Sequence, residues 1–352
     1  MSVTMRDVAA RANVSVATVS KSLRGAASIP AGTRAAVLEI ATQMGYRIHP
    51  YVSALMRARR QSKDPGQPAP LAFITAYPTA DGWKKTPTPF LPLLFEGAKQ
   101  RADERGYPLS HFWLFRDNMT NHRLSEVLRA RGVRGILLPP LPSPDMEINL
   151  AWPNFSVVSV GATLANPIFH CMSNDHYHSM QLAMEACWRN GCRRPAFTAD
   201  RWVNQRIDRR WEAAFAIARE QHAFRRDIPT LLYERWDPDI VVRWVRQEKP
   251  DVLFSVFSET QLEELKERGL RIPREVGIVS LSVHQDNSPL TGIRQHAKLM
   301  GTVAVDQLIS QVERNETGIP EHPITLTMKG SWNDGLTLYR ASAVDDADTR
   351  ER

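Results

Sequence analysis

Five side chains near the N-terminus are spaced so that they can read the edges of base pairs. Val16, Ser20 and Arg24 follow at steps of four residues, and Ala17 and Lys21 lie one position round, so on a helix all five share a face. In the major groove of DNA, Lys can donate to guanine and Ala can contact a thymine methyl group. The spacing predicts a helix that inserts this face into the groove.

Three short helices are expected to position that face. Between Thr4 and Gly45, apolar residues recur at helical spacing in three groups. Thr4 with Asp7 resembles a capping box, Ser15 can cap the second helix, and Gly45 suits the left-handed residue after the third. This pattern predicts an all-α headpiece of the helix-turn-helix type. The positions expected in its core are Met5, Val8, Ala9, Ala12, Val19, Leu23, Val37, Ile40, Ala41 and Met44.

The net charge of the chain lies entirely in this N-terminal part. Residues 1–60 hold nine Lys and Arg against two acidic residues, whereas the other 292 residues hold 36 of each sign. A local positive field on an otherwise balanced protein selects a polyanion, so we expect double-stranded DNA as the partner. The alternative is a basic three-helix appendage on a larger enzyme.

The segment after the three helices, residues 49–60, is expected to fold only when docked. Pro50 can open a helix there, and about ten residues are too few for a stable isolated helix in water. If two copies pair over DNA, Leu55 can wedge between base pairs in the minor groove, while the nearby arginines face phosphates. The alternative for Leu55 is burial against the third helix.

The remainder of the chain alternates β-rich and helical runs. Residues 61–70 (QSKDPGQPAP) have the composition of a linker, which places domains at 1–60 and 71–340 and a disordered tail at 341–352. The βαβ rhythm indicates mostly parallel sheets covered by helices, and about 270 residues of it suggest two lobes. Ligands of such sheets bind beyond the carboxyl ends of the strands, so two facing lobes predict a ligand cleft.

Several stretches together resemble the LacI/GalR family of transcriptional regulators. VTMRDVAARANVSVATVSKSLRG and IPAGTRAAVLEIATQMGYRIHPYVSALM resemble the family's headpiece and hinge, and GLRIPREVGIVSLS and TGIRQH with GTVAVDQLISQ resemble its effector domain. The resemblance implies a dimeric repressor on a pseudo-palindromic operator. Its α/β body would be bilobal and periplasmic-binding-protein-like, and would bind a small-molecule effector, a sugar or another metabolite.

The family's DNA contacts carry over residue by residue. Leu55 matches the hinge leucine, whereas Lys21 stands where Arg is usual, Arg24 where Asn is common, and His49 where Asn is usual. Because Lys offers a point charge where Arg offers a bidentate fork, the operator sequence cannot be taken from relatives. The base-reading positions fall on Val16, Ala17, Ser20 and Lys21, and the positions near the DNA backbone on Thr4, Met5, Ser15, Ser28 and Thr33.

The effector site is less clearly marked. Family members hold the ligand with an Arg after one strand, here Arg206 or Arg209, and an Asp at the end of a later strand, where this chain has Ser282. The usual pair for vicinal sugar hydroxyls is therefore expected to be incomplete. The alternative for each further candidate is structural packing or a solvated loop. Those candidates are Asp175 and Glu259 as polar contacts, and Trp113, Trp202 and Phe257 as stacking faces.

Other chemistry is not expected. The sequence has no P-loop, G-x-S-x-G elbow, zinc-hydrolase motif or dinucleotide fingerprint, so we expect neither an enzyme nor a cofactor. Cys171, Asp175, His176 and His178 lie close in sequence, but the two histidines would point to different helix faces, so no metal is expected. The alternatives to an effector-controlled regulator are an architectural DNA binder without effector and an enzyme with a DNA-docking headpiece.

The expected location is the cytoplasm, on the nucleoid. Three cysteines are too few for a disulfide framework, and no segment approaches the roughly 20 apolar residues of a membrane span.

Overall fold

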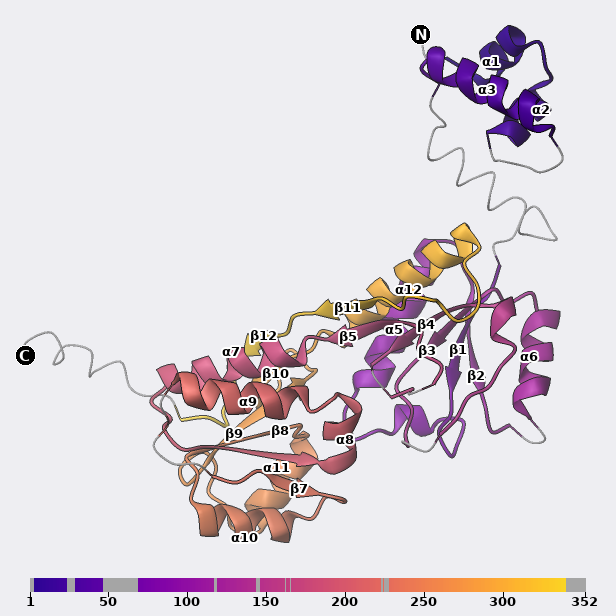
Figure 1. Cartoon of the computed structure of the whole chain (residues 1–352). Coiled ribbons are helices and arrows are strands. Elements are labelled where there is room, and N and C mark those ends of the chain that lie inside the picture. Colours follow the sequence, from indigo (N-terminus) through magenta and orange to yellow (C-terminus); the bar gives the residue numbers. More distant parts are fainter. Residues whose placement is uncertain are drawn as a thin grey trace, which may run out of the picture. The chain divides into compact units, whose positions relative to one another are not determined.

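The computed structural model describes residues 3–23, 29–46, 69–116, 119–143, 146–161, 163–164, 166–222, 224 and 228–339. The chain divides into two compact units, residues 1–67 and 68–352, and each is described by itself (Figure 1). Most of the predicted linker, residues 61–68, and the tail 341–352 lie outside the described residues.

The first unit is a three-helix headpiece, as predicted. Its helices are α1 (Met5–Ala12), α2 (Val16–Ser22) and α3 (Ala31–Gln43). All ten apolar positions predicted from the sequence belong to one cluster, centred on the fully buried Val8 and Val19. Isolated helices of this length are only marginally stable in water. The burial of apolar residues from all three helices is therefore what stabilises so small a unit.

The predicted caps of the headpiece are present. The Thr4 amide donates to the Asp7 carboxylate at 2.8 Å, and the Asp7 amide donates back to the Thr4 hydroxyl at 3.4 Å. The Ser15 hydroxyl accepts from the Thr18 amide at 3.1 Å, and Gly45 has φ +68°. Each cap satisfies a backbone group that the helix itself leaves without a partner, so the helix ends lie where the sequence indicates.

The second unit contains two α/β lobes, which confirms the predicted bilobal body. Lobe 1 is a parallel six-stranded sheet in the order β11-β5-β4-β3-β1-β2. Helices α5 and α12 cover one face of it and α6 the other. The elements are β1 (Leu71–Thr75), α5 (Phe90–Glu104), β2 (Leu109–Trp113), α6 (Asn121–Ala130), β3 (Gly135–Leu138), β4 (Ser156–Val160), β5 (His170–Asn174), α12 (Ala297–Arg314) and β11 (Thr325–Met328).

Lobe 2 repeats this three-layer plan. Its sheet has the order β12-β10-β9-β8-β6-β7, and all neighbours are parallel except β10 and β12. Helices α7 and α9 cover one face, and α10 and α11 the other. The elements are α7 (His176–Arg189), β6 (Pro195–Asp200), α8 (Arg201–Arg206), α9 (Arg210–Gln221), β7 (Leu231–Tyr233), α10 (Pro238–Glu248), β8 (Val252–Ser255), α11 (Glu259–Glu267), β9 (Gly277–Val283), β10 (Thr291–Arg294) and β12 (Ser331–Asn333).

Three crossings of the chain join the lobes: β5 to α7, β10 to α12, and β11 to β12. Hydrogen bonds tie the crossings to one another. The Asp175 amide donates to the Met328 carbonyl at 2.8 Å, and the His296 ring lies 2.9 Å from the Ser331 hydroxyl. Because three adjacent segments cross together, the lobes can pivot about this hinge but cannot slide apart.

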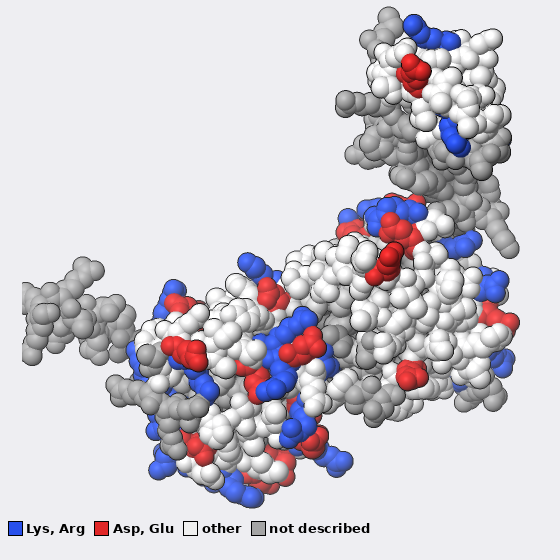
Figure 2. Space-filling view, viewed as in Figure 1, with Lys and Arg blue, Asp and Glu red and all other residues white. Residues whose placement is uncertain are grey.

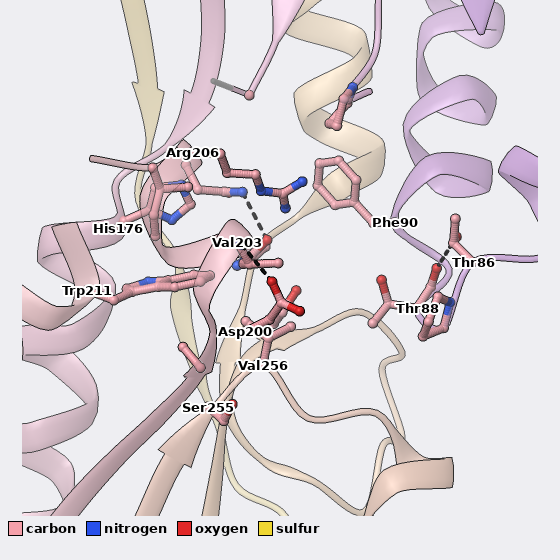
Figure 3. Close-up of a pocket in the computed structure, with 18 of the residues that line it drawn as sticks. Thr86, Thr88, Phe90, His176, Asp200, Val203, Arg206, Trp211, Ser255 and Val256 are labelled. Atoms are coloured by element: carbon pink, nitrogen blue, oxygen red, sulfur yellow. Dashed lines mark hydrogen bonds between the residues drawn. The ribbon is translucent and has the colours of Figure 1, made fainter. Parts of the chain in front are cut away.

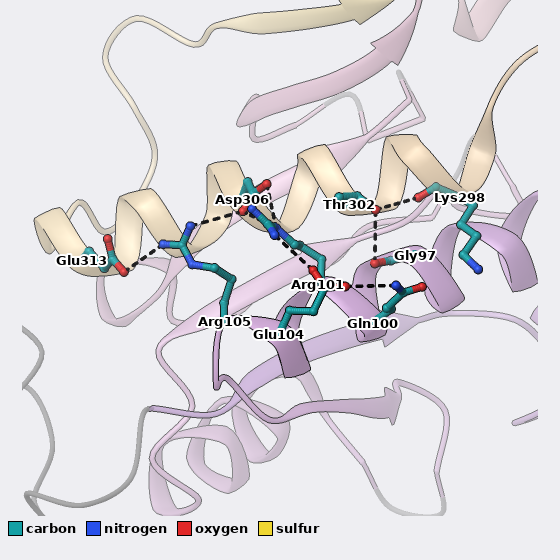
Figure 4. Close-up of polar contacts among 9 residues, drawn as sticks. All are labelled: Gly97, Gln100, Arg101, Glu104, Arg105, Lys298, Thr302, Asp306 and Glu313. Atoms are coloured by element: carbon teal, nitrogen blue, oxygen red, sulfur yellow. Dashed lines mark hydrogen bonds and ion pairs between the residues drawn. The ribbon is translucent and has the colours of Figure 1, made fainter.

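Helices α5 and α12 of lobe 1 cross in direct backbone contact (Figure 4). A Cβ atom added to Gly97 would lie 1.9 Å from the Lys298 carbonyl oxygen, and one added to Gly301 would lie 2.0 Å from the Leu94 carbonyl oxygen. Beyond the glycines, the Arg101 Nε donates to the Asp306 carboxylate at 2.9 Å. The two glycines therefore set the separation of the helices, and the ion pair fixes their register.

Within the described ranges, none of the helices combines the length and the apolar character that a bilayer-crossing segment needs.

Candidate functional site

The exposed face of α2 is the candidate nucleic-acid interface of the headpiece. Val19 is 0% exposed in the core, whereas Val16, in the first turn of α2, is 42% exposed. Ala17 and Lys21 are also exposed, and Ser20 is half-buried. An apolar residue held in water beside a cation suits a groove that offers thymine methyl groups and guanine acceptors.

The other predicted DNA contacts are placed as follows. The hydroxyls of Thr4 and Ser15 cap helices, Met5 is partly buried against the headpiece core, and Thr33 lies in the first turn of α3. Arg24, Ser28, His49 and Leu55 lie outside the described residues. On the second unit, Figure 2 shows Lys and Arg intermixed with Asp and Glu, in keeping with its balanced sequence.

A cavity of about 400 Å³ lies between the two lobes of the second unit. As predicted for sheets of this kind, its walls come from the carboxyl ends of the strands and the turns that follow them. Lobe 1 contributes Tyr77, Thr86, Thr88, Phe90 and Thr163, lobe 2 contributes Asp200, Arg206, Trp211, Tyr233, Trp236, Ser255 and Ser282, and the crossings contribute Asn174, His176 and Gln295 (Figure 3).

Aromatic rings supply much of the cavity wall. The Tyr233 and Trp236 rings lie edge to face with centroids 5.8 Å apart, and the Trp236 indole is anchored by donating to the Glu264 carboxylate at 2.5 Å. Burial raises the pKa of Tyr233 to about 12, so its phenol is neutral and can both donate and accept. Such faces suit the apolar side of a ring, with polar groups at its rim.

Two groups of opposite charge line the cavity, at the two ends of α8. The Asp200 carboxylate caps the helix, accepting from the Val203 amide at 2.9 Å. The Arg206 guanidinium makes no hydrogen bond or ion pair with any residue the structure describes. Burial lowers its pKa, although an arginine remains protonated at neutral pH. The cavity therefore holds a cation that the Asp200 carboxylate attracts through space but that no described residue pairs with directly.

A side-chain relay ties two of the crossings together at the cavity. The Gln295 Nε2 donates to the Leu281 carbonyl at 2.7 Å, so its Oε1 faces Asn174, whose Nδ2 donates to it at 2.9 Å. Asn174 is 7% exposed, and its Oδ1 is left without a hydrogen-bond donor among the described residues. The orientation of the Asn174 amide is thus fixed, and it presents an acceptor at the hinge.

His176 begins α7 beside this relay. Burial, together with the positive charges of Arg206 and Arg210, lowers the pKa of His176 to about 3. Its ring packs edge to face on the Trp211 indole with centroids 4.6 Å apart, and its Nδ1 has no partner in the described part of the chain. The histidine is therefore neutral and can serve as a hydrogen-bonding group, not as a charge.

Of the effector contacts predicted from the sequence, Arg206 and Ser282 line the cavity, and the Ser282 hydroxyl lies 2.8 Å from the His284 ring. The other predicted residues do not line it. Trp113 donates to the Tyr77 carbonyl, Asp175 caps α7, Glu259 accepts from Ser288, Phe257 is buried against Trp236, Trp202 lies half-buried on α8, and Arg209 pairs with Glu212.

Sequence reasoning missed most of the cavity. Asp200 and Tyr233 close two of the strands that the β-rich runs predict, so the strand-end rule alone could have found them. Trp211, Trp236 and Asn174 carried no such signal, because only the fold brings them together. Among the described residues, no three His, Cys, Asp or Glu side chains are placed to hold a metal ion, and the Cys171 thiol donates to the Gly161 carbonyl at 3.2 Å.

Comparisons with family models match both units. Residues 4–48 match the model of bacterial regulatory proteins of the lacI family, and residues 184–332 match the periplasmic binding protein-like domain. A search of curated proteins finds no match.

Solved structures show the same fold at low identity. The transcriptional regulator CelR in its cellobiose complex is 20% identical, with a TM-score of 0.57 over 95% of this chain and 99% of that one. The Lac repressor dimer bound to operator and the anti-inducer ONPF is 19% identical, with a TM-score of 0.58 over 96% and 100%. The LacI family regulator CCPA of Weissella paramesenteroides with bound glucose is 14% identical, with a TM-score of 0.56 over 77% and 98%.

Proposed function

We propose, from the premise that the headpiece is a DNA-binding domain of the lacI family and the body a periplasmic binding protein-like effector domain, that this regulator acts as a dimeric repressor. Each dimer would bind a pseudo-palindromic operator on the nucleoid, through α2 of both headpieces. A small molecule bound between the lobes would control that binding.

The interlobe cavity is the observation that carries this proposal. Its volume of about 400 Å³ is within the range of small-molecule sites, and hydrogen-bonding groups from both lobes converge on it. An architectural DNA binder would have no use for such groups, and the cost of burying them unpaired favours a ligand that satisfies them. Two of the similar solved structures contain a sugar, cellobiose in one and glucose in the other. A sugar or a related metabolite is therefore the first class of ligand to test.

The proposed mechanism uses the hinge. A ligand that contacts both lobes stabilises one angle between them, and the change of angle alters how two bodies pair and how far apart their headpieces are held. Only a ligand with different affinities for the two arrangements can have this effect. No catalytic step is part of the proposal.

Footprinting tests the DNA half of the proposal. The full chain should protect a pseudo-palindrome in the DNA beside its own gene, and a panel of sugars and sugar acids should include a compound that changes the protection. Equal protection of scrambled DNA at moderate salt would contradict sequence-specific binding. The midpoint of thermal unfolding should rise when a compound binds. If no compound of the panel raised it, effector control would be contradicted.

A further inference from the structure

Arg206 differs from its neighbours in lacking an ion-pair partner among the described residues. Four arginines lie within residues 201–210, and three of them have acidic partners: Arg201 with Glu234 at 2.5 Å, Arg209 with Glu212 at 2.8 Å, and Arg210 with Asp208 at 2.9 Å. Arg206 has none among the described residues, and it is the one of the four that lines the cavity. A positive charge withdrawn from water without a partner is costly, so the site is built for an anion.

Asp200 attracts Arg206 through space but does not form an ion pair with it. One of the Asp200 oxygens is committed to the Val203 amide at the other end of α8. Figure 3 shows the Arg206 guanidinium directed across the cavity toward Phe90, away from the Asp200 carboxylate. A ligand can therefore reach the cation without displacing an existing bond.

The remaining polar groups call for hydrogen-bond donors on the same ligand. The relay from Leu281 through Gln295 fixes Asn174 so that its Oδ1 is an unpaired acceptor, and the second oxygen of Asp200 is a further acceptor. Tyr233 and Trp236 add flat apolar surface. The cavity thus combines a partner for an anionic group, acceptors for hydroxyls and faces for a ring.

Resting on the proposed function, we infer that the effector is a hydroxylated carboxylic acid, a sugar acid in its chemistry. Its carboxylate is held by Arg206, and its hydroxyls donate to Asn174 and Asp200. A guanidinium matches a carboxylate in a two-bond geometry, which a neutral hydroxymethyl group at the same position cannot reproduce.

Matched pairs of compounds test the inference on the full chain. The probes are D-glucuronate against D-glucose and D-galacturonate against D-galactose, with D-gluconate as an open-chain acid. Calorimetric titration should give at least one acid with a Kd ten times lower or more than its neutral counterpart. R206Q should lose at least tenfold in affinity for that acid, R206K should retain part of it, and R201Q, which removes a paired arginine of the same helix, should change it little.

Separate outcomes bear on the inference and on the proposed function. Neutral sugars binding as tightly as their acids, no acid binding, or an R206Q variant that keeps its affinity for the acid would each overturn the sugar-acid assignment. Binding of L-leucine or L-glutamine in place of the sugar acids would also overturn it, because their donor is an ammonium group. The proposed function fails on a different measurement, the absence of any operator preference by the wild-type chain in gel-shift assays both with and without the compounds.

Discussion

At the scale of single residues, His176 makes the stability of the body depend on pH. The unfolded chain takes up a proton at this side chain near the ordinary pKa of 6.5, whereas the folded chain does so only near pH 3. The unfolded state binds more protons between these values, so stability is complete above pH 6.5 and is lost as the pH falls. His284, whose pKa burial lowers to about 4, contributes with the same sign.

The expected loss for His176 alone between pH 7 and pH 5 is about 2 kcal/mol in the free energy of unfolding. Urea unfolding of the wild type and of His176→Gln at both pH values measures it. The variant should lose less stability than the wild type over this interval, by about that amount. Equal losses in the two proteins would show that the histidine titrates in the folded state as it does in the unfolded chain.

Lys21 is expected to read one base pair. Lys21→Ala should relax the preference at a single operator position by about 1–3 kcal/mol and leave the other positions unchanged. Binding to a set of single-position operator variants provides the measurement. Lys99→Ala, which removes an exposed lysine of the body, is the control and should leave operator affinity unchanged. A uniform loss over all operator variants would instead make Lys21 a phosphate contact.

Residue roles were the hardest to predict from sequence. The resemblance pointed to Arg206 or Arg209, and of the two Arg206, at the end of α8, lines the cavity. The aromatic residues of the wall could not be chosen, since Trp113 and Trp236 are equally apolar in sequence and only the turns decide which one faces inward. Ser282 lines the cavity at the position where the family resemblance implies a carboxylate, and Asp200 offers a carboxylate from a different strand.

At the scale of elements, the glycine crossing of α5 and α12 predicts a reversal of an ordinary rule. Gly→Ala inside a helix usually stabilises by about 0.5–1 kcal/mol. Gly97→Ala should instead destabilise the body by about 1–3 kcal/mol, because the new methyl group would lie 1.9 Å from the Lys298 carbonyl oxygen. Thermal unfolding of the full chain measures the difference.

Gly32→Ala is the matched control for this substitution. Gly32 lies in helix α3, and a Cβ atom there would meet nothing within 4 Å. The midpoint temperature of headpiece unfolding should therefore stay unchanged or rise. If both substitutions stabilised their units equally, the two body helices would not be held at the separation described.

Elements with strong periodicity could be predicted from sequence, and the exceptions have physical reasons. The three headpiece helices follow from their apolar stripes and caps, and the β-rich runs became β1, β2, β3, β4, β6, β7, β8 and β9. Strands β5 and β12 gave little signal, because HCMSN and SWN are short and polar and are held by their neighbours in the sheet. Strand β11 is an exposed edge, so it lacks the buried residues that mark a strand in sequence.

At the scale of the whole molecule, the Asn174–Gln295 relay is expected to set the energy of the hinge. Gln295→Leu leaves both the Asn174 amide and the Leu281 carbonyl without their partner, which costs about 1–3 kcal/mol for each buried group. Denaturant unfolding should show the loss in the body transition and not in the headpiece transition.

An exposed glutamine supplies the control for the hinge variant. Gln100 lies on the surface of α5, where it donates to Glu104 at 3.0 Å, and Gln100→Leu should change stability by no more than about 0.5 kcal/mol. A Gln295→Leu protein as stable as the control would mean that the relay contributes little to holding the crossings together.

Because the chain crosses between the lobes three times, the body can complete its fold only late in translation, after the headpiece. The headpiece core is complete once residue 46 has emerged, whereas the sheet of lobe 1 still lacks β11 and its covering helix α12 after residue 290. Until then Leu71, Phe73 and Val158 have only α5, and not α12, to cover them on one side. An arrested translation product would therefore carry an intact DNA-binding unit attached to a body that cannot fold or respond.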